Sequence, residues 1–105
     1  MNQIRAIGET LRSFLESRYR SGLKEVILYG SHARGTATED SDVDFLVVVD
    51  EALDPWEVHD CLDDLLWRLL LETGRLVSVI VVREGHYERY RSPFMTNVRR
   101  EGIRL

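Results

Sequence analysis

Two aspartates, Asp42 and Asp44, lie two positions apart at the start of an apolar run that is typical of a β-strand. Because side chains alternate between the two faces of a strand, both carboxylates would project from one face, about 6 to 7 Å apart at the backbone. Mg²⁺ is commonly held by one or two carboxylates, while waters and substrate phosphates complete its shell. The pair therefore predicts a magnesium site that a nucleoside triphosphate would complete.

A glycine–serine pair, Gly30 and Ser31, follows another strand-like run. Glycine allows the backbone to approach a ligand closely, and the free amides that open a short helix can bind phosphate oxygens. Alone, such a pair is more often a turn with a serine cap, and an Asp-x-Asp pair is more often a solvated strand end. Here ten residues separate Ser31 from Asp42, and each pair adjoins its own strand. This combination is much more specific and indicates phosphoryl or nucleotidyl transfer.

The charged residues near these pairs are unevenly distributed along the chain. Residues 39–64 hold eleven Asp and Glu and no Lys or Arg, so a polyphosphate would be repelled there unless a divalent cation bridged the two. Arg34 either neutralises a triphosphate or forms a salt bridge to the acidic loop, and His32 is more typical of a surface residue. The net charge of −4 argues against direct nucleic-acid binding and against a polybasic membrane binder.

The periodicity of apolar residues predicts the elements that must position these groups. Apolar residues on both faces of residues 42–49 favour a central strand. We expect a single α/β (α+β) domain over residues 1–105, with a small mixed sheet flanked by helices. Its strands are expected at residues 25–29, 42–49 and 76–82, and its helices at residues 2–19, 54–74, 84–91 and 93–101.

The remaining composition bears on compartment and packing. The chain has one cysteine, Cys61, no signal-peptide pattern at its start and no apolar run long enough to span a membrane, so a cytoplasmic location is expected. Trp56, Trp67 and Leu71 are expected to pack in the core, with a partner-binding patch as the alternative.

The chain resembles the minimal nucleotidyltransferases of the DNA polymerase beta superfamily, known as the antitoxin half of HEPN/MNT toxin–antitoxin pairs. The family signature falls on the Gly-Ser and Asp-x-Asp pairs, and residues 92–103 are similar to the family's C-terminal helix. The resemblance implies a polymerase-beta-like fold. It also implies catalytic, nucleotide-binding and metal-binding residues. The catalytic set is Asp42, Asp44 and Ser31, the nucleotide-binding set is Gly30, Ser31, Arg34 and Ser41, and the metal ligands are Asp42 and Asp44.

The same resemblance implies an activity and a partner. It implies transfer of a nucleoside monophosphate, typically AMP from ATP, onto a hydroxyl with the help of two Mg²⁺ ions. In the paired systems that hydroxyl belongs to a tyrosine of the toxin, so a helical HEPN-type protein is the expected partner. The sequence leaves open whether the chain forms a homo-oligomer.

One departure from the family pattern bears on catalysis. Such enzymes usually carry a third carboxylate on the strand after the long helix, where it helps bind the catalytic metal and accepts the proton of the attacking hydroxyl. The matching position here is Ser78, which can do neither, and Glu72 and Glu84 lie only at the two ends of that strand. The second metal ion is therefore in doubt. The alternatives are a weak or inactive nucleotide-binding antitoxin that acts by contact, and an interaction domain without a nucleotide site.

Overall fold

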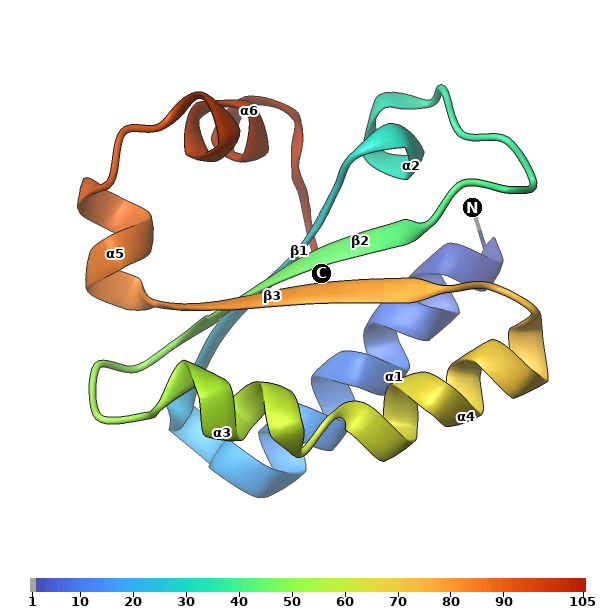
Figure 1. Cartoon of the computed structure of the whole chain (residues 1–105). Helices are drawn as coiled ribbons and strands as arrows, with labels where there is room; N and C mark the ends of the chain where they lie inside the picture. The colour runs from blue at the N-terminus through green and yellow to red at the C-terminus, as the bar shows by residue number, and fades with distance from the viewer. Residues whose placement is uncertain (1) are drawn as a thin grey trace.

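A four-stranded mixed sheet separates two layers of helices in the computed structural model, which describes residues 2–105 (Figure 1). The strand order is β3-β2-β1-β4, with β2 parallel to β3 and antiparallel to β1, and with β4 antiparallel to β1. The strands are β1 (Leu23–Tyr29), β2 (Val43–Val49), β3 (Val77–Arg83) and β4 (Ile103–Arg104). The expected mixed sheet and the central position of residues 42–49 are confirmed.

The helices lie on both faces of the sheet (Figure 1). One face is covered by α1 (Asn2–Tyr19), α3 (Pro55–Asp60) and α4 (Asp63–Thr73), and the 3₁₀ turn η1 (Arg20–Gly22) joins α1 to β1. The other face carries α2 (Ser31–Arg34), α5 (Glu84–Arg89) and α6 (Pro93–Glu101). The expected first and last helices have their predicted bounds, whereas the two-residue strand β4 was not anticipated.

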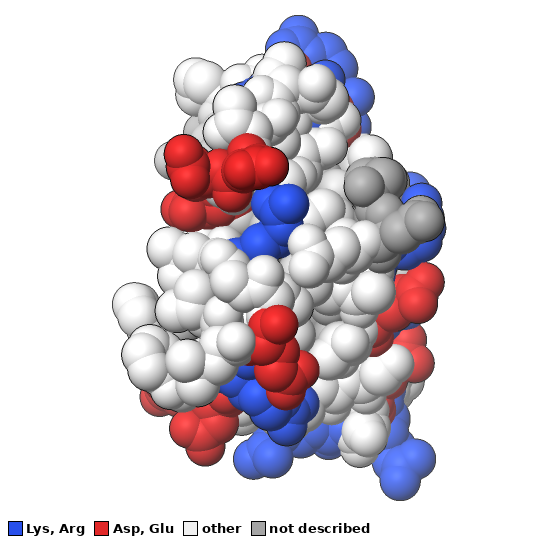
Figure 2. All heavy atoms as spheres, turned by 90° about the vertical axis from the view of Figure 1, so that its right-hand side faces the viewer, with Lys and Arg blue, Asp and Glu red and all other residues white. Residues whose placement is uncertain are grey.

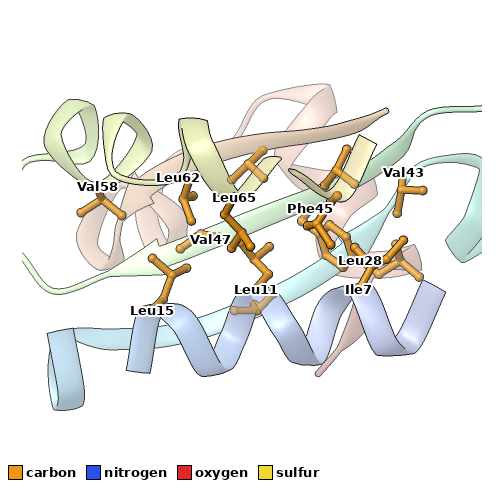
Figure 3. Packing of buried hydrophobic residues seen from close by; sticks show 14 of the residues in the cluster. Ile7, Leu11, Leu15, Leu28, Val43, Phe45, Val47, Val58, Leu62 and Leu65 are labelled. Atoms are coloured by element: carbon orange, nitrogen blue, oxygen red, sulfur yellow. The ribbon is translucent and has the colours of Figure 1, made fainter. Parts of the chain in front are cut away.

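The main core lies between β2 and the layer formed by α1, α3 and α4 (Figure 3). Leu11 and Leu15 of α1 point toward Phe45 and Val47 of β2, and all four side chains are fully buried. The alternation of β2 places its odd-numbered residues on this face. A smaller apolar cluster occupies the other face and contains Ile27, Leu46, Val48, Tyr87, Met95 and Val98. Apolar packing on both faces fixes the register of β2, which also carries Asp44.

The predicted long helix over residues 54–74 is wrong, because the structure has two helices there. Asp54 caps α3 through a 2.9 Å bond from the Trp56 N–H, a role typical of an aspartate before a helix that begins with proline. The Leu62 N–H then bonds to the carbonyl of His59 at 2.9 Å, three residues back, which tightens the chain between α3 and α4. Val58 and Leu62 are both buried, so the break keeps apolar side chains of both helices in one core.

Three large apolar side chains do not pack in the core as expected. Trp56 is 81% exposed, Trp67 63% and Leu71 69%. Trp56 belongs to α3, and Trp67 and Leu71 belong to α4. In the described part of the chain, no helix combines the length and the apolar character that a membrane span requires.

Candidate active site

The turn between β1 and α2 lies directly against Asp44. Gly30 caps α2 with φ +78° and ψ −157°, a conformation open almost only to glycine. A Cβ atom added to Gly30 would collide with the Asp44 Oδ2 atom. The glycine therefore provides both the turn and the space that the carboxylate occupies, and the expected convergence of the Gly-Ser bend with Asp44 is present.

The two aspartates are neighbours with different environments. Asp44 is half-buried within β2, whereas Asp42 is exposed and lies just before the first residue of that strand, Val43. Burial raises the pKa of Asp44, and the nearby Asp42 carboxylate raises it further. Like charges held this close favour a bound cation, because the cation would offset their mutual repulsion.

His32 and Ser41 close the loop above the site. The His32 Nε2 atom lies 3.5 Å from the carbonyl oxygen of Ser41, and the His32 ring lowers the pKa of Asp44 when it is charged. The Thr38 N–H donates to the Ser41 Oγ atom at 2.9 Å. The Ser41 side chain therefore holds the loop in shape, and His32 lies nearer to the candidate metal ligands than its sequence context indicated.

Arg34 lies between the site and the C-terminal helix. Its Nη1 atom is 3.6 Å from the Glu101 Oε2 atom of α6, so its salt bridge is not to the acidic loop. The Arg34 charge also lowers the pKa of Asp44. The Arg34 side chain is 47% exposed, and the five N–H donors of its guanidinium leave it capacity for a phosphate as well as for Glu101.

Tyr29, which sequence reasoning missed, forms another part of this face. The β1–β2 register places Tyr29 opposite Asp44, and burial together with the Asp44 charge raises the pKa of Tyr29 to about 12. Its ring meets Phe94 of α6 edge to face, with centroids 5.3 Å apart. The only available signal was the position of Tyr29 beside Gly30, because its alignment with Asp44 depends on the strand register.

The position expected for a third carboxylate is occupied by a serine beside Asp44. The parallel β2–β3 register pairs Asp44 with Ser78, so both side chains lie on the same face of the sheet. Glu72 is on α4, which covers the opposite face, and Glu84 begins α5 at the far end of β3. Neither glutamate is placed at the site.

The uneven charge distribution along the chain does not produce a uniformly acidic surface on the face shown in Figure 2. Asp and Glu side chains there form several small groups, each with Lys or Arg beside it. The Lys24–Asp50 pair, with 3.8 Å between its charged atoms, likewise links the acidic segment to a basic residue outside it. The local carboxylates near Asp44 therefore matter more for a bound phosphate than the net charge does.

These groups fit a divalent cation that is completed by a ligand. Two carboxylates lie next to the start of α2, where the Ala33 and Arg34 N–H groups donate to the Gly30 carbonyl and the Ser31 and His32 N–H groups precede the first helical acceptor. Within residues 2–105, no group of three or more His, Cys, Asp or Glu could hold a metal by itself. Asp42 and Asp44 could hold Mg²⁺ only in the manner that leaves most of its shell to waters and substrate phosphates.

The sequence matches a known family and two named relatives. Residues 9–93 match the nucleotidyltransferase domain family. The chain is 39% identical over 103 residues to a candidate protein adenylyltransferase of Methanocaldococcus jannaschii, covering 97% of this chain and 96% of that protein. It is 53% identical over 82 residues to the protein adenylyltransferase MntA of Thermococcus cleftensis, covering 69% and 81% of the two chains.

The fold also matches solved structures. One is a complex of a tri-AMPylated HEPN toxin of Shewanella oneidensis with its MNT antitoxin. Its matching chain superposes with a TM-score of 0.56 at 15% identity, covering 96% of this chain and 70% of that one. At this identity the likeness shows the fold alone, which agrees with the expected small mixed sheet flanked by helices.

Replacing Gly30 by alanine is expected to reduce the free energy of unfolding by about 2–3 kcal/mol, because the new Cβ meets the Asp44 carboxylate in a backbone conformation that alanine avoids. Gly74→Ala is the matched control, since Gly74 also has a positive φ of 73° but no atom near its Cβ position. It should lose only about 1 kcal/mol. Urea unfolding measures the free energy of unfolding of both variants. Equal losses in the two variants would contradict the close approach of Gly30 to the Asp44 carboxylate.

Replacing Asp44 by asparagine is expected to raise the free energy of unfolding near neutral pH. The folded-state pKa of Asp44 lies above its ordinary value of 3.8, so the folded protein binds this proton more tightly than the unfolded chain does. Stability from this carboxyl is therefore present below about pH 3.8 and is lost as pH rises through the folded-state pKa. The Asp44→Asn variant should therefore be more stable than the wild type at pH values above the folded-state pKa of Asp44. Below about pH 3.8 the two proteins should be equally stable.

Urea unfolding without divalent cations, at about pH 3 and about pH 7, measures this difference. Asp40→Asn is the control, because Asp40 is an exposed carboxyl of the same loop. An equal gain for Asp44→Asn at both pH values would mean that packing, and not charge, causes the effect.

Proposed function

The chain belongs to the nucleotidyltransferase domain family, and we propose that it transfers AMP from ATP onto a hydroxyl of a partner protein in a Mg²⁺-dependent reaction. One observation carries the proposal: the Gly30 turn and the Asp44 carboxylate are in contact, and the Asp42 charge acts on Asp44. A triphosphate seated on the turn would reach both carboxylates through a shared cation.

The proposed roles follow from the chemistry of each group. The backbone amides after Gly30 and the Ser31 hydroxyl hold the terminal phosphates, and Arg34 offsets their negative charge. Asp42 and Asp44 hold Mg²⁺, which when bound draws electron density from the α-phosphate and from the departing pyrophosphate. Ser41 contributes by keeping the loop closed over the nucleotide. Together these residues orient the α-phosphate for in-line attack.

The transfer exchanges one P–O bond for another. The acceptor oxygen forms a bond to the α-phosphorus while the bond between that phosphorus and the α–β bridging oxygen breaks. Pyrophosphate leaves with the electron pair of the broken bond, and the hydroxyl proton passes to water. Because Ser78 cannot serve as an anionic base, the proton transfer is the weakest part of this site, and we propose one firmly held ion instead of two.

The proposed acceptor is a HEPN-type helical protein. Two adenylyltransferase relatives and the fold shared with an MNT antitoxin bound to an AMPylated HEPN toxin support this assignment. Direct nucleic-acid binding forms no part of the proposal. The free Cys61 is compatible with a reducing cytoplasm as the place of action.

A second function is favoured by Ser78, which lies beside Asp44 where a third carboxylate would be needed. In this alternative, the protein binds a nucleotide but neutralises its partner by contact. The two functions differ in whether AMP is transferred, and they agree on the binding site.

Wild-type protein should bind a non-hydrolysable ATP analogue only when Mg²⁺ is present, as measured by isothermal titration calorimetry. Asp42→Asn and Asp44→Asn are each expected to weaken that binding at least about tenfold, since each removes an anionic ligand of the cation. Asp40→Asn should bind as the wild type does. The wild type and the variants are also incubated with α-labelled ATP and the protein encoded by the neighbouring gene. The amount of label on that partner should follow the affinity of each variant for the ATP analogue.

Mg²⁺-dependent binding without label transfer would favour the contact-only antitoxin. Unchanged binding by both aspartate variants would contradict the proposed site.

Ser78→Asp is expected to raise the rate of AMP transfer by about 10² or more, because it places a carboxylate beside Asp44 to act as base and metal ligand. Ser78→Ala is the matched control and should leave the rate unchanged, since the proposal gives the Ser78 hydroxyl no chemical role. Initial rates at saturating ATP measure both variants. A rate for Ser78→Asp at or below that of Ser78→Ala would show that the third position lies elsewhere.

A further inference from the structure

A groove of about 560 Å³ follows the outer edge of β3. Trp56 and His59 of α3 line one side, His86 of α5 lines the other, and Ile80 of β3 forms part of the floor. Figure 1 shows α3 and α5 on opposite faces of the sheet beside this strand. Trp56 and Ile80 are 81% and 39% exposed, so large apolar side chains are left open to solvent in the groove.

The edge of β3 itself is unprotected. β3 pairs with β2 on one side, and no described strand pairs with its other side. Soluble proteins usually protect such an edge with charged residues, proline or a bulge. Residues 77–82 contain neither charge nor proline, and their register with β2 is continuous. An open edge between two helices has the geometry that binds an extended peptide as an added strand.

The strand β3 runs from this groove, whose β3 lining begins at Val79, to the candidate active site, where Ser78 pairs with Asp44. Ile80 is two residues from Ser78, so both side chains lie on the face of the sheet that carries Asp44. A strand added to β3 would lie two strand spacings, or about 10 Å, from β2 at the backbone. The bound nucleotide and a long acceptor side chain would together span the distance from β2 to the added strand. The small Ser78 side chain, which lies between them, would leave room for both.

We propose that the acceptor tyrosine, which the family resemblance implies, lies in an extended segment of the partner protein, and that this segment binds by pairing with the outer edge of β3. The inference rests on the proposed function and adds the form of its substrate. The segment would carry apolar residues against Ile80 and Trp56. It would also carry an acidic residue about five positions from the tyrosine, because Arg83 is five residues from Ser78 and is exposed.

A second copy of the chain is the competing occupant of this edge. Pairing between two β3 strands would cover the approach from the edge to Asp44, so it would oppose transfer to any acceptor that arrives there. An acceptor segment paired with the same edge would instead place its side chain beside Ser78, next to the candidate metal ligand Asp44. The bond changes are those of the proposed transfer, with the tyrosine oxygen as the attacking atom and pyrophosphate as the leaving group.

The test uses the full chain and a library of synthetic peptides with one fixed tyrosine. Each peptide has apolar residues at alternate positions and glutamate five residues before or after the tyrosine. A second library has the same side chains but N-methylated backbone amides at alternate residues, which prevents strand pairing. The readouts are transfer of label from α-labelled ATP, Mg²⁺-dependent binding of an ATP analogue, and the oligomeric state by light scattering.

The wild type is expected to label the first library at least about tenfold more than the N-methylated one. Ile80→Lys and Trp56→Ala should each reduce labelling about tenfold or more, mainly through a higher KM for peptide, while binding of the ATP analogue stays within about twofold. Leu71→Lys is the control, because Leu71 is exposed on α4 and does not line the groove. It should label as the wild type does.

Equal labelling of the two libraries, or no labelling of either while the ATP analogue still binds, would overturn the inference and leave nucleotide binding intact. Dimers of the wild type that Ile80→Lys converts to monomers with unchanged or faster labelling would assign the edge to a second copy instead. Loss of Mg²⁺-dependent analogue binding in the wild type would overturn the proposed function itself.

Discussion

The contact between the Gly30 backbone and the Asp44 carboxylate is the constraint on which the site depends. Any side chain at Gly30 would displace that carboxylate, and a different strand register would move Asp44 to the other face of the sheet. The register is held by apolar packing on both faces of β2, where Phe45 and Leu46 are both fully buried. A polar site at one end of a strand is thus positioned by the apolar residues that follow it.

The electrostatics of the site oppose the folded protein and favour a ligand. Burial and the neighbouring Asp42 both disfavour the charged form of Asp44, while His32 and Arg34 only partly compensate. A cation shared with a triphosphate would relieve that repulsion. Burial, and after it the Asp44 charge, also raises the pKa of Tyr29. The unfavourable charge in the free protein would favour the metal and nucleotide binding that we propose there.

Ser78 and the outer edge of β3 give the site its particular character. The serine removes a carboxylate from the position next to Asp44 and also leaves space between Asp44 and the edge of the sheet. The exposed Trp56 and Ile80 lie along that same edge. In the proposed mechanism, the missing base and the access for an acceptor have one structural origin, since both follow from a small side chain on an edge strand.

The sequence by itself determined the local features: the helix capped by Asp54, the alternation of β2, the mixed α/β class, and the spacing that relates Ser31 to Asp42. These depend on periodicity and capping, which are properties of neighbouring residues. Only the tertiary structure decided that Tyr29 and Ser78 lie beside Asp44, that residues 54–74 form two helices, and that Trp56 is exposed on an open edge. Strand register and long-range packing join residues that are distant in the chain, so no local pattern specifies them.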